Sequence, residues 1–419
     1  MTLKIETPLT LPCGLVLPNR LAKAAMAEDW AGSNNFPHEK FIDTYGVWAD
    51  GDWGLVMTGN VQVDINHLGQ RNDIALREPG LRAKQLEAWK KWSAVTNKNG
   101  TPTIVQINHP GRQSTVGAGH RGFFGKTIAP SVVPVNLGSG WLARAAAAFV
   151  FGTPREMTKE DIAGVVADFA DAAKMSYEAG FAGVEIHAAH GYLLAQFMSA
   201  KTNLRTDEYG GSPKNRSRII VEVIEAIRKV VPKTFCVGIK FNSVDHQSQT
   251  ELAKCIEQLE DIVDAGVDFL EISGGTYEDP IMVTGESLES DEKPKEAPKA
   301  STVAREAFFL EFAQAIRDKF DDIPLMVTGG FRTRQGMEKA IADGACDLVG
   351  LGRPAVLTPD LPKKIIFNKD IPDAEAKVKT IDINHQSLAD FLGLKFLARG
   401  TEVVWYGAQL RKILSVYKN

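Results

Sequence analysis

Hydrophobic positions along the chain fall into short apolar runs separated by stretches of helical periodicity. Eight runs are rich in apolar and β-branched residues, and we predict strands at Leu21–Met26, Gly54–Val63, Pro102–Ile107, Gly183–Ala188, Phe235–Phe241, Phe269–Gly275, Leu325–Gly330 and Asp347–Gly352. Between most of them, apolar residues recur every three or four positions, as in 163–173 and 219–230. This alternation predicts parallel strands joined by right-handed helical crossovers.

The runs are apolar throughout, as expected when helices cover a sheet outside and packed side chains fill it inside. We therefore expect an α/β fold, a (β/α)8 TIM barrel. An open Rossmann-type sheet is the alternative, but no Gly-x-Gly-x-x-Gly turn joins a strand to a helix near the N-terminus. Residues Ile5–Val16, with Pro8, Pro12 and Gly14, predict a small hairpin that closes the barrel floor.

The domain organisation expected from this pattern is one barrel over residues 1–370 and a helical extension over 371–419 packed on it. The extension carries an apolar stripe formed by Leu388, Phe391, Leu394 and Phe396–Leu397. Two connections are unusually long, 110–158 after the third strand and 276–300 after the sixth. Both follow carboxyl ends of strands, where barrel active sites are built, so we expect lids, although the charged 276–300 segment equally suits a solvated loop.

The charge and cysteine content of the chain limit the classes of function that it could have. The chain has 419 residues, of which 44% are hydrophobic and 24% charged, and its net charge of −4 gives no reason to expect nucleic acid or an anionic membrane as partner. The four cysteines, Cys13, Cys236, Cys255 and Cys346, lack zinc or iron–sulfur spacing. No targeting segment is recognisable and the longest apolar patch, 145–151, is too short to span a bilayer. We expect a cytoplasmic monomer or homodimer without a metal ion.

Polar residues interrupt the apolar pattern at strand ends. They are Gln106, Asn108 and His109 at the third strand, His187 and His190 at the fourth, Lys240 and Asn242 at the fifth, and Gly352 and Arg353 at the eighth. In a barrel these side chains gather at one mouth.

His187 and His190 form a His-x-x-His pair, with Tyr192 two residues further on. Such a pair could ligate a metal ion. Alternatively, two imidazoles that donate hydrogen bonds to one carbonyl oxygen stabilise the negative charge that develops when a hydride adds to a conjugated alkene. Tyr192 would then lie ready to protonate the neighbouring carbon.

Glycine-rich loops follow the last two strands, Thr328-Gly329-Gly330-Phe331 and Gly350-Leu351-Gly352-Arg353. In barrels such loops commonly hold a phosphate through backbone N–H groups, and Arg353 would add a charge-assisted contact. Aldolases and synthases use similar loops, so this feature predicts a phosphorylated ligand and no particular reaction.

Several longer segments resemble the Old Yellow Enzyme family of FMN-dependent ene-reductases, over essentially the whole barrel. The resemblance lies in Pro18-Asn19-Arg20 and in residues 106–112, 185–193 and 203–212. It implies a tightly bound FMN, NADPH or NADH as reductant, and hydride delivery to a small electron-poor alkene in a ping-pong cycle.

The resemblance also implies roles for single residues. His187 and His190 match the donors to the substrate oxygen, and Tyr192 matches the proton donor. The positions that match flavin contacts are Ala25, Met26, Ala27, Asn60, Gln106, His187 and Lys240 along the ring, and Gly329, Gly330, Gly352 and Arg353 around the phosphate.

The sequence departs from the common family pattern at three places, one of which is a stretch of two residues. Lys240 stands where an arginine usually lies beside the flavin N1 and O2 edge, so the positive charge stays but the planar fork is lost. Ala27 replaces the usual Cys or Thr, and Glu28 with Asp29 occupy a stretch where some relatives place a substrate-pocket tyrosine. We expect Asp29 to contact substrate, and the three changes to alter flavin potential and substrate preference.

Two other functions remain as alternatives. A phosphate-binding barrel lyase or aldolase would use Lys240 as a Schiff-base nucleophile. A flavin-binding regulatory protein with decayed reductase activity is the second, and the intact His187, His190 and Tyr192 argue against it.

Overall fold

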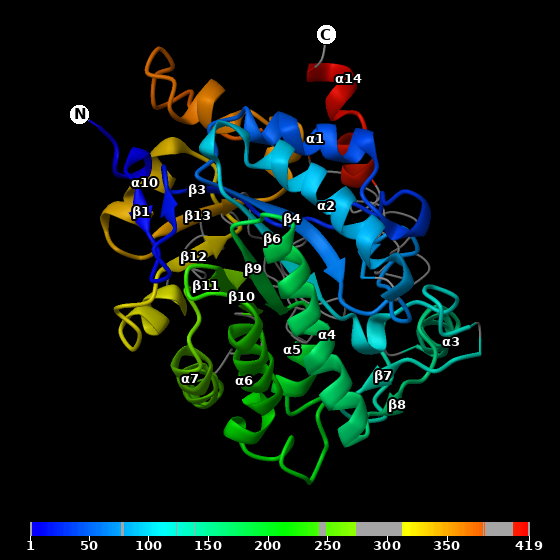
Figure 1. The fold of residues 1–419 in the computed structure, drawn as a ribbon. Coiled ribbons are helices and arrows are strands. Elements are labelled where there is room, and N and C mark those ends of the chain that lie inside the picture. Colours follow the sequence, from blue (N-terminus) through cyan, green and yellow to red (C-terminus); the bar gives the residue numbers. More distant parts are fainter. Residues whose placement is uncertain are drawn as a thin grey trace.

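The computed structural model describes residues 2–76, 79–122, 124–138, 140–242, 249–273, 312–379, 381 and 405–417. Eight strands form a closed parallel barrel: β3 (Leu21–Lys23), β4 (Leu55–Gln62), β6 (Thr103–Asn108), β9 (Gly183–Ala188), β10 (Cys236–Asn242), β11 (Phe269–Ser273), β12 (Leu325–Thr328) and β13 (Leu348–Leu351). The ring closes because β3 pairs with both β13 and β4. The predicted (β/α)8 barrel is confirmed (Figure 1). Each of its eight strands overlaps a predicted run.

Helices surround the strands in Figure 1. The longer ones are α1 (Glu39–Ala49), α2 (Arg82–Thr96), α3 (Trp141–Val150), α4 (Lys159–Glu178), α6 (Pro213–Val230), α7 (Gln249–Asp264) and α10 (Arg334–Ala342), and the shorter ones are α5 (Leu193–Met198), α11 (Arg353–Leu357) and α14 (Ile413–Tyr417). Single turns lie at η1 (Lys4–Glu6), η2 (Ser33–Asn35), η3 (Pro79–Leu81), η4 (Lys98–Gly100), η5 (Gly111–Gln113) and the π-helical η6 (Pro362–Ile366), and short strands at β5 (Ile74–Ala75), β7 (Ile128–Ala129) and β8 (Arg155–Glu156).

Local sequence explains where the long helices begin. Thr158 caps α4 by accepting the Asp161 backbone N–H at 3.1 Å, while the Asp161 carboxylate accepts the Thr158 N–H at 2.8 Å. Ser212 accepts the Asn215 N–H at 3.2 Å, and Pro213 then opens α6. These caps fix where each crossover turns back along the barrel wall.

The barrel floor is closed by the predicted hairpin, in which β1 (Leu9–Thr10) pairs antiparallel with β2 (Val16–Leu17). Its turn uses Gly14 at φ 86°, a left-handed conformation that favours glycine. Leu11 and Leu17 from this hairpin join the buried side chains of the barrel interior, namely Ala22, Leu55, Met57, Ile104, Cys236, Phe269, Met326 and Leu348.

Interior side chains are layered according to strand register. In the floor layer Gly238 lies opposite Phe269, and a Cβ on Gly238 would stand 2.1 Å from the Phe269 ring, so only glycine fits there. The next residues towards the mouth are polar: Gln106 pairs with Glu185, and Lys240 pairs with Glu271. The barrel interior therefore has an apolar layer at its floor and a polar layer nearer the mouth.

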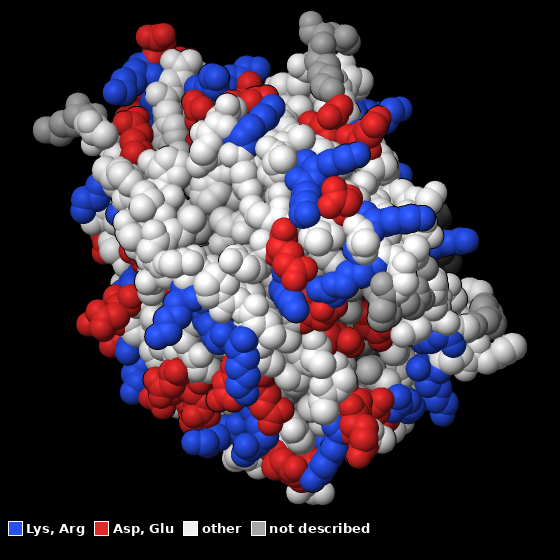
Figure 2. Space-filling model, viewed as in Figure 1, with Lys and Arg blue, Asp and Glu red and all other residues white. Residues whose placement is uncertain are grey.

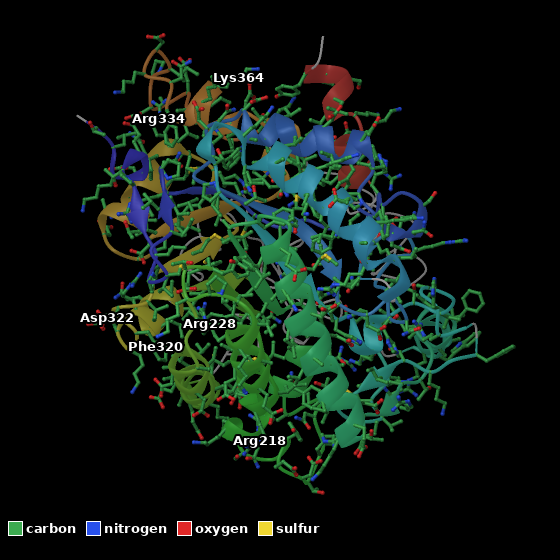
Figure 3. The ribbon with its side chains drawn as sticks, viewed as in Figure 1. Arg218, Arg228, Phe320, Asp322, Arg334 and Lys364 are labelled. Atoms are coloured by element: carbon green, nitrogen blue, oxygen red, sulfur yellow. The ribbon has the colours of Figure 1, made fainter. Side chains whose placement is uncertain are left out.

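After the last barrel strand, residues 362–378 fold back over α10. The Arg334 guanidinium, labelled with Lys364 in Figure 3, donates to the backbone oxygens of Ile365, Ile366, Asn368 and Ile371 and pairs with Asp373 at 2.9 Å. Further along, α14 packs against α1. The predicted stripe at 388–397 and the loop at 276–300 lie outside the described residues.

The surface seen in Figure 2 carries Lys and Arg side chains interspersed with Asp and Glu. No helix among the described residues is both long and apolar enough to cross a membrane. The 110–158 connection, predicted as a lid, contains η5, β7, α3 and β8.

Candidate active site

The histidine pair lies at the carboxyl end of β9. His187 belongs to the strand, and the chain then turns sharply through His190 at φ 57° and Gly191 at φ 72°. Left-handed backbone at a non-glycine residue is uncommon and needs support. The Asn242 side chain at the end of β10 provides it by accepting the His190 backbone N–H at 3.0 Å. This turn folds His190 back onto His187.

Hydrogen bonds fix the proton positions on both imidazoles. The Ala189 N–H points at His187 Nδ1 at 3.2 Å, so the proton of a neutral His187 is on Nε2. His187 Nε2 lies 3.1 Å from His190 Nδ1, which accepts, and the His190 proton is then on Nε2, 3.2 Å from Ser273 Oγ. A directed chain of donors therefore runs from β9 to β11.

Both imidazoles are held neutral. Burial lowers the pKa of His187 well below its ordinary value, and the neighbouring His190 and Lys240 lower it further. Burial and Lys240 likewise keep the pKa of His190 well below its ordinary value. Neutral imidazoles donate hydrogen bonds without bringing positive charge to the mouth.

Tyr192 completes the group. Its ring stands perpendicular to the His187 ring with centroids 4.8 Å apart. Its hydroxyl lies 3.4 Å from Asn60 Nδ2, which comes from β4 on the opposite side of β6. The structure thus brings Asn60 of β4 together with His187, His190 and Tyr192 at the carboxyl end of β9.

Below the histidines lies the polar layer. Lys240 Nζ is 2.7 Å from Glu271 Oε1, and their side chains are 2% and 0% exposed. Gln106 Nε2 donates to Glu185 Oε2 at 2.6 Å. Because the amide nitrogen of Gln106 faces Glu185, its side-chain carbonyl oxygen points away from Glu185 and can accept a hydrogen bond.

The glycine loops after β12 and β13 lie beside the segment that follows β3, because the Ala24 N–H donates to Leu351 O at 3.1 Å. Gly329 and Gly330 have φ of 121° and 81°, and a Cβ on Gly352 would stand 3.4 Å from Met26 Cγ. The nearby Thr328 Oγ1 is buried without a hydrogen-bond partner among the described residues. Glycine loops, whose backbone N–H groups can be approached closely, and the unpartnered Thr328 hydroxyl are features that suit a phosphorylated ligand with a flat ring, such as FMN.

Arg353 follows these loops, and its guanidinium lies 6.0 Å from the centre of the Tyr406 ring. Tyr406 belongs to the C-terminal part of the chain, so the residues at 405–417 reach the same edge of the barrel as the glycine loops.

Residues 25–29 follow β3, but their side chains take different directions. The Glu28 carboxylate hydrogen-bonds to the Tyr45 hydroxyl and accepts the Gly59 N–H at 2.9 Å. Burial raises the pKa of Glu28, whose carboxyl group lies between α1 and β4. Asp29, predicted to contact substrate, accepts the Asn72 N–H at 3.0 Å and is partly exposed.

Sequence reasoning passed over Lys23, Glu185, Glu271 and Ser273. Glu185 lies two residues before His187 on the same strand, and Glu271 two residues before Ser273, so period two places each pair on one face. Charged residues inside apolar runs were the available signal. Lys23 is different: it faces outward, donates to Met57 O at 2.8 Å, and lies 4.5 Å from the centre of the Trp48 ring on α1.

Two groups in the described part of the chain have metal-ligand composition, Asp64–His67–His109 and Cys13–Cys236–Asp268, and neither includes His187 or His190. In the first, His109 Nδ1 accepts the Gly111 N–H at 3.0 Å, which places its proton on Nε2. A protonated nitrogen is not a metal ligand in this arrangement.

Comparison with known proteins gives a consistent result. Residues 4–372 match the NADH:flavin oxidoreductase / NADH oxidase family. The chain is 50% identical over 403 residues to the NADH-dependent flavin oxidoreductase iliE of Neonectria sp. (strain DH2), covering 96% of this chain and 51% of that protein, so it spans about half of that relative. It is 48% identical over 414 residues to the NADH-dependent flavin oxidoreductase iccE of Talaromyces variabilis, covering 98% of both.

Solved structures with the same fold include a 2-naphthoyl-CoA reductase complex, with a TM-score of 0.73 and 24% identity over 90% of this chain and 53% of that one. Morphinone reductase aligns with a TM-score of 0.67 and 24% identity, covering 87% of this chain and 89% of that one.

Proposed function

Because this chain belongs to the NADH:flavin oxidoreductase / NADH oxidase family, an FMN-dependent family that uses a nicotinamide as reductant, we propose that it reduces the C=C bond of α,β-unsaturated carbonyl or nitro compounds. The observation that carries this proposal is the convergence of the neutral His187 and His190 with Tyr192 at the barrel mouth. Two imidazole donors and a phenol beside them suit a substrate oxygen and the carbon that must receive a proton.

The residues that would hold FMN are grouped as its chemistry requires. Gly329, Gly330, Gly352 and Arg353 would take the phosphate, and Gln106, Lys240 and the backbone at 25–27 would take the ring. Bound there, FMN supplies the hydride acceptor for the nicotinamide and the hydride donor for the alkene.

The histidines bind and polarise the substrate oxygen in this proposal. His187 Nε2 already carries a proton, whereas His190 Nδ1 accepts from it. For both to donate to one oxygen, His190 must move its proton from Nε2 to Nδ1. Ser273 permits this, because its hydroxyl can change from acceptor to donor towards His190 Nε2.

Tyr192 delivers the proton to carbon. Its hydroxyl lies beside Asn60 Nδ2, which donates to the phenolic oxygen and so favours both its position and loss of its proton. Nicotinamide and alkene would use the same mouth in turn, giving a ping-pong cycle. We propose NADH as the reductant, which the names of the two relatives favour.

A Schiff-base lyase fits this geometry less well. Lys240 donates to the buried Glu271 carboxylate at 2.7 Å, and such a pair stabilises the ammonium form rather than the neutral amine that attacks a carbonyl.

The test has three steps. Cofactor released from the purified protein is identified as FMN or not, the protein is reduced anaerobically with NADH or NADPH, and the reduced protein is mixed with cyclohexenone. We expect FMN, reduction by NADH and reoxidation with formation of cyclohexanone. Reoxidation by oxygen but by none of a panel of enones and nitroalkenes would contradict the proposed reaction while leaving the cofactor in place.

A further inference from the structure

Two buried carboxyl groups, those of Glu185 and Glu271, have no role in the reaction just described, although they contact Gln106 and Lys240. Glu185 on β9 and Glu271 on β11 are both 0% exposed, and they flank β10, which carries Lys240. One oxygen of each has a partner: Glu185 Oε2 accepts from Gln106 and Glu271 Oε1 from Lys240.

The second oxygen of each carboxyl group has no donor. Glu185 Oε1 and Glu271 Oε2 are buried and unpartnered among the hydrogen bonds of the described residues. Burial raises the pKa of Glu185 well above its ordinary value, and the nearby carboxyl group of Glu271 raises it further. A single proton between them gives both unpartnered oxygens a hydrogen bond at once.

The balance of charges in the buried site also indicates one proton on the two carboxyl groups. Two adjacent carboxylates in a buried site resist simultaneous ionisation, and a buried charge needs an opposite charge close by. Lys240 is the one cation within hydrogen-bond distance of the pair among the described residues, because Lys23 faces outward to α1 and the two histidines are neutral. The single positive charge of Lys240 balances one carboxylate, so one of the two carboxyl groups carries a proton.

We propose that Glu185 and Glu271 share one proton and together form the counter-charge of Lys240, and that this pair sets the positive charge which Lys240 presents to the flavin. The shared proton is inferred from the burial and contacts of these residues alone, whereas its effect on the flavin rests on the proposed function. Both glutamates act through Lys240 and are positioning residues.

The proton count is tested by infrared spectroscopy of the whole protein at neutral pH, which detects the carbonyl stretch of a protonated carboxylic acid. The variants are Glu185→Gln, Glu271→Gln and the double variant, with Glu87→Gln as control because Glu87 lies on α2 with its side chain 67% exposed. We expect each single variant to lose one such band, the double variant to lose no more than a single one, and the control to lose none. No loss in either single variant, or a second loss in the double variant, would overturn the shared proton.

The effect on the cofactor is tested by the midpoint potential of the same proteins. Each single variant keeps one carboxylate, so its ratio of reduced to oxidised flavin at a fixed potential should stay within about threefold of wild type, or about 15 mV for two electrons. The double variant leaves Lys240 without a counter-charge and should favour the reduced flavin by at least about tenfold, or 30 mV. Equal, additive shifts in the single variants would contradict the proposal. A protein without FMN would overturn the proposed function and leave the infrared test intact.

Discussion

His187 Nε2 and His190 Nδ1 lie 3.1 Å apart and are hydrogen-bonded to each other, so the pair is arranged as donor and acceptor rather than as two donors. The arrangement follows from the Ala189 N–H, which occupies His187 Nδ1 at 3.2 Å. Binding a substrate oxygen therefore requires a change of tautomer at His190, and the residue that accommodates this change is Ser273.

Replacing Ser273 with Ala should weaken the binding of a phenol to the oxidised enzyme. The variant loses the donor to His190 Nε2 in the tautomer that binds the phenol, a neutral hydrogen bond worth about 0.5–1.5 kcal/mol, or at most roughly a twofold to tenfold change in Kd. A phenol titration followed by the flavin spectrum measures it. Ser176→Ala is the matched control, because the Ser176 hydroxyl bonds to Ala172 O within α4. Unchanged affinity in Ser273→Ala would show that Ser273 does not select the tautomer.

Tyr192→Phe should leave flavin reduction by NADH unchanged and slow reoxidation by an enone, because only the second half-reaction delivers a proton to carbon. Loss of a positioned proton donor typically costs about 10²–10⁴ in rate, less where water substitutes. Anaerobic stopped-flow experiments separate the two halves. Equal slowing of both would assign Tyr192 a purely structural role.

His109→Asn should make stability less sensitive to acid. Burial, with the nearby His67 charge, lowers the pKa of His109 to about 3 in the folded protein, whereas an unfolded histidine titrates near about 6.5. As pH falls below about 6.5 the unfolded chain binds a proton that the folded chain does not, so this residue lowers the free energy of unfolding by about 1.4 kcal/mol per pH unit until about pH 3.

Asparagine removes this titration while its side-chain oxygen can still accept the Gly111 N–H. Denaturant unfolding between pH 6.5 and 4 should therefore show a slope that is shallower by that amount in the variant. Parallel pH profiles for the two proteins would contradict the buried, neutral state of His109.

The sequence predicted the barrel well because its signals are local. All eight strands were found from apolar runs, although β3 ends at Lys23 rather than Met26, since residues beyond Lys23 leave the ladder to form the mouth. The histidine pair was also found, because it lies at a strand end.

The supporting groups were harder to predict, for two different physical reasons. Glu185 shares the face of His187 by simple alternation, so its position was available from the pattern although its partner was not. The contacts of Glu28 with Tyr45 and of His190 with Ser273 join residues 17 and 83 positions apart, and only the closed barrel brings these together.

Gly238→Ala should destabilise the barrel floor by about 1–3 kcal/mol, the usual cost of overpacking a tight core. The added Cβ would stand 2.1 Å from the Phe269 ring, which fills the space above the glycine. Urea unfolding measures the loss. A second variant, Gly238→Ala with Phe269→Leu, should recover part of the stability because the smaller side chain makes room, and no recovery would place the strain elsewhere.

The central claim is that His187 and His190 together bind the oxygen of the alkene substrate, and single-turnover kinetics test it most directly. Wild type, His187→Ala and His190→Ala are reduced anaerobically to completion and mixed with cyclohexenone, and the rate of flavin reoxidation is recorded. Each variant should keep FMN and react about 10²–10³-fold more slowly, as is typical when one donor to a developing oxyanion is removed. Reoxidation of both variants at the wild-type rate would contradict the account.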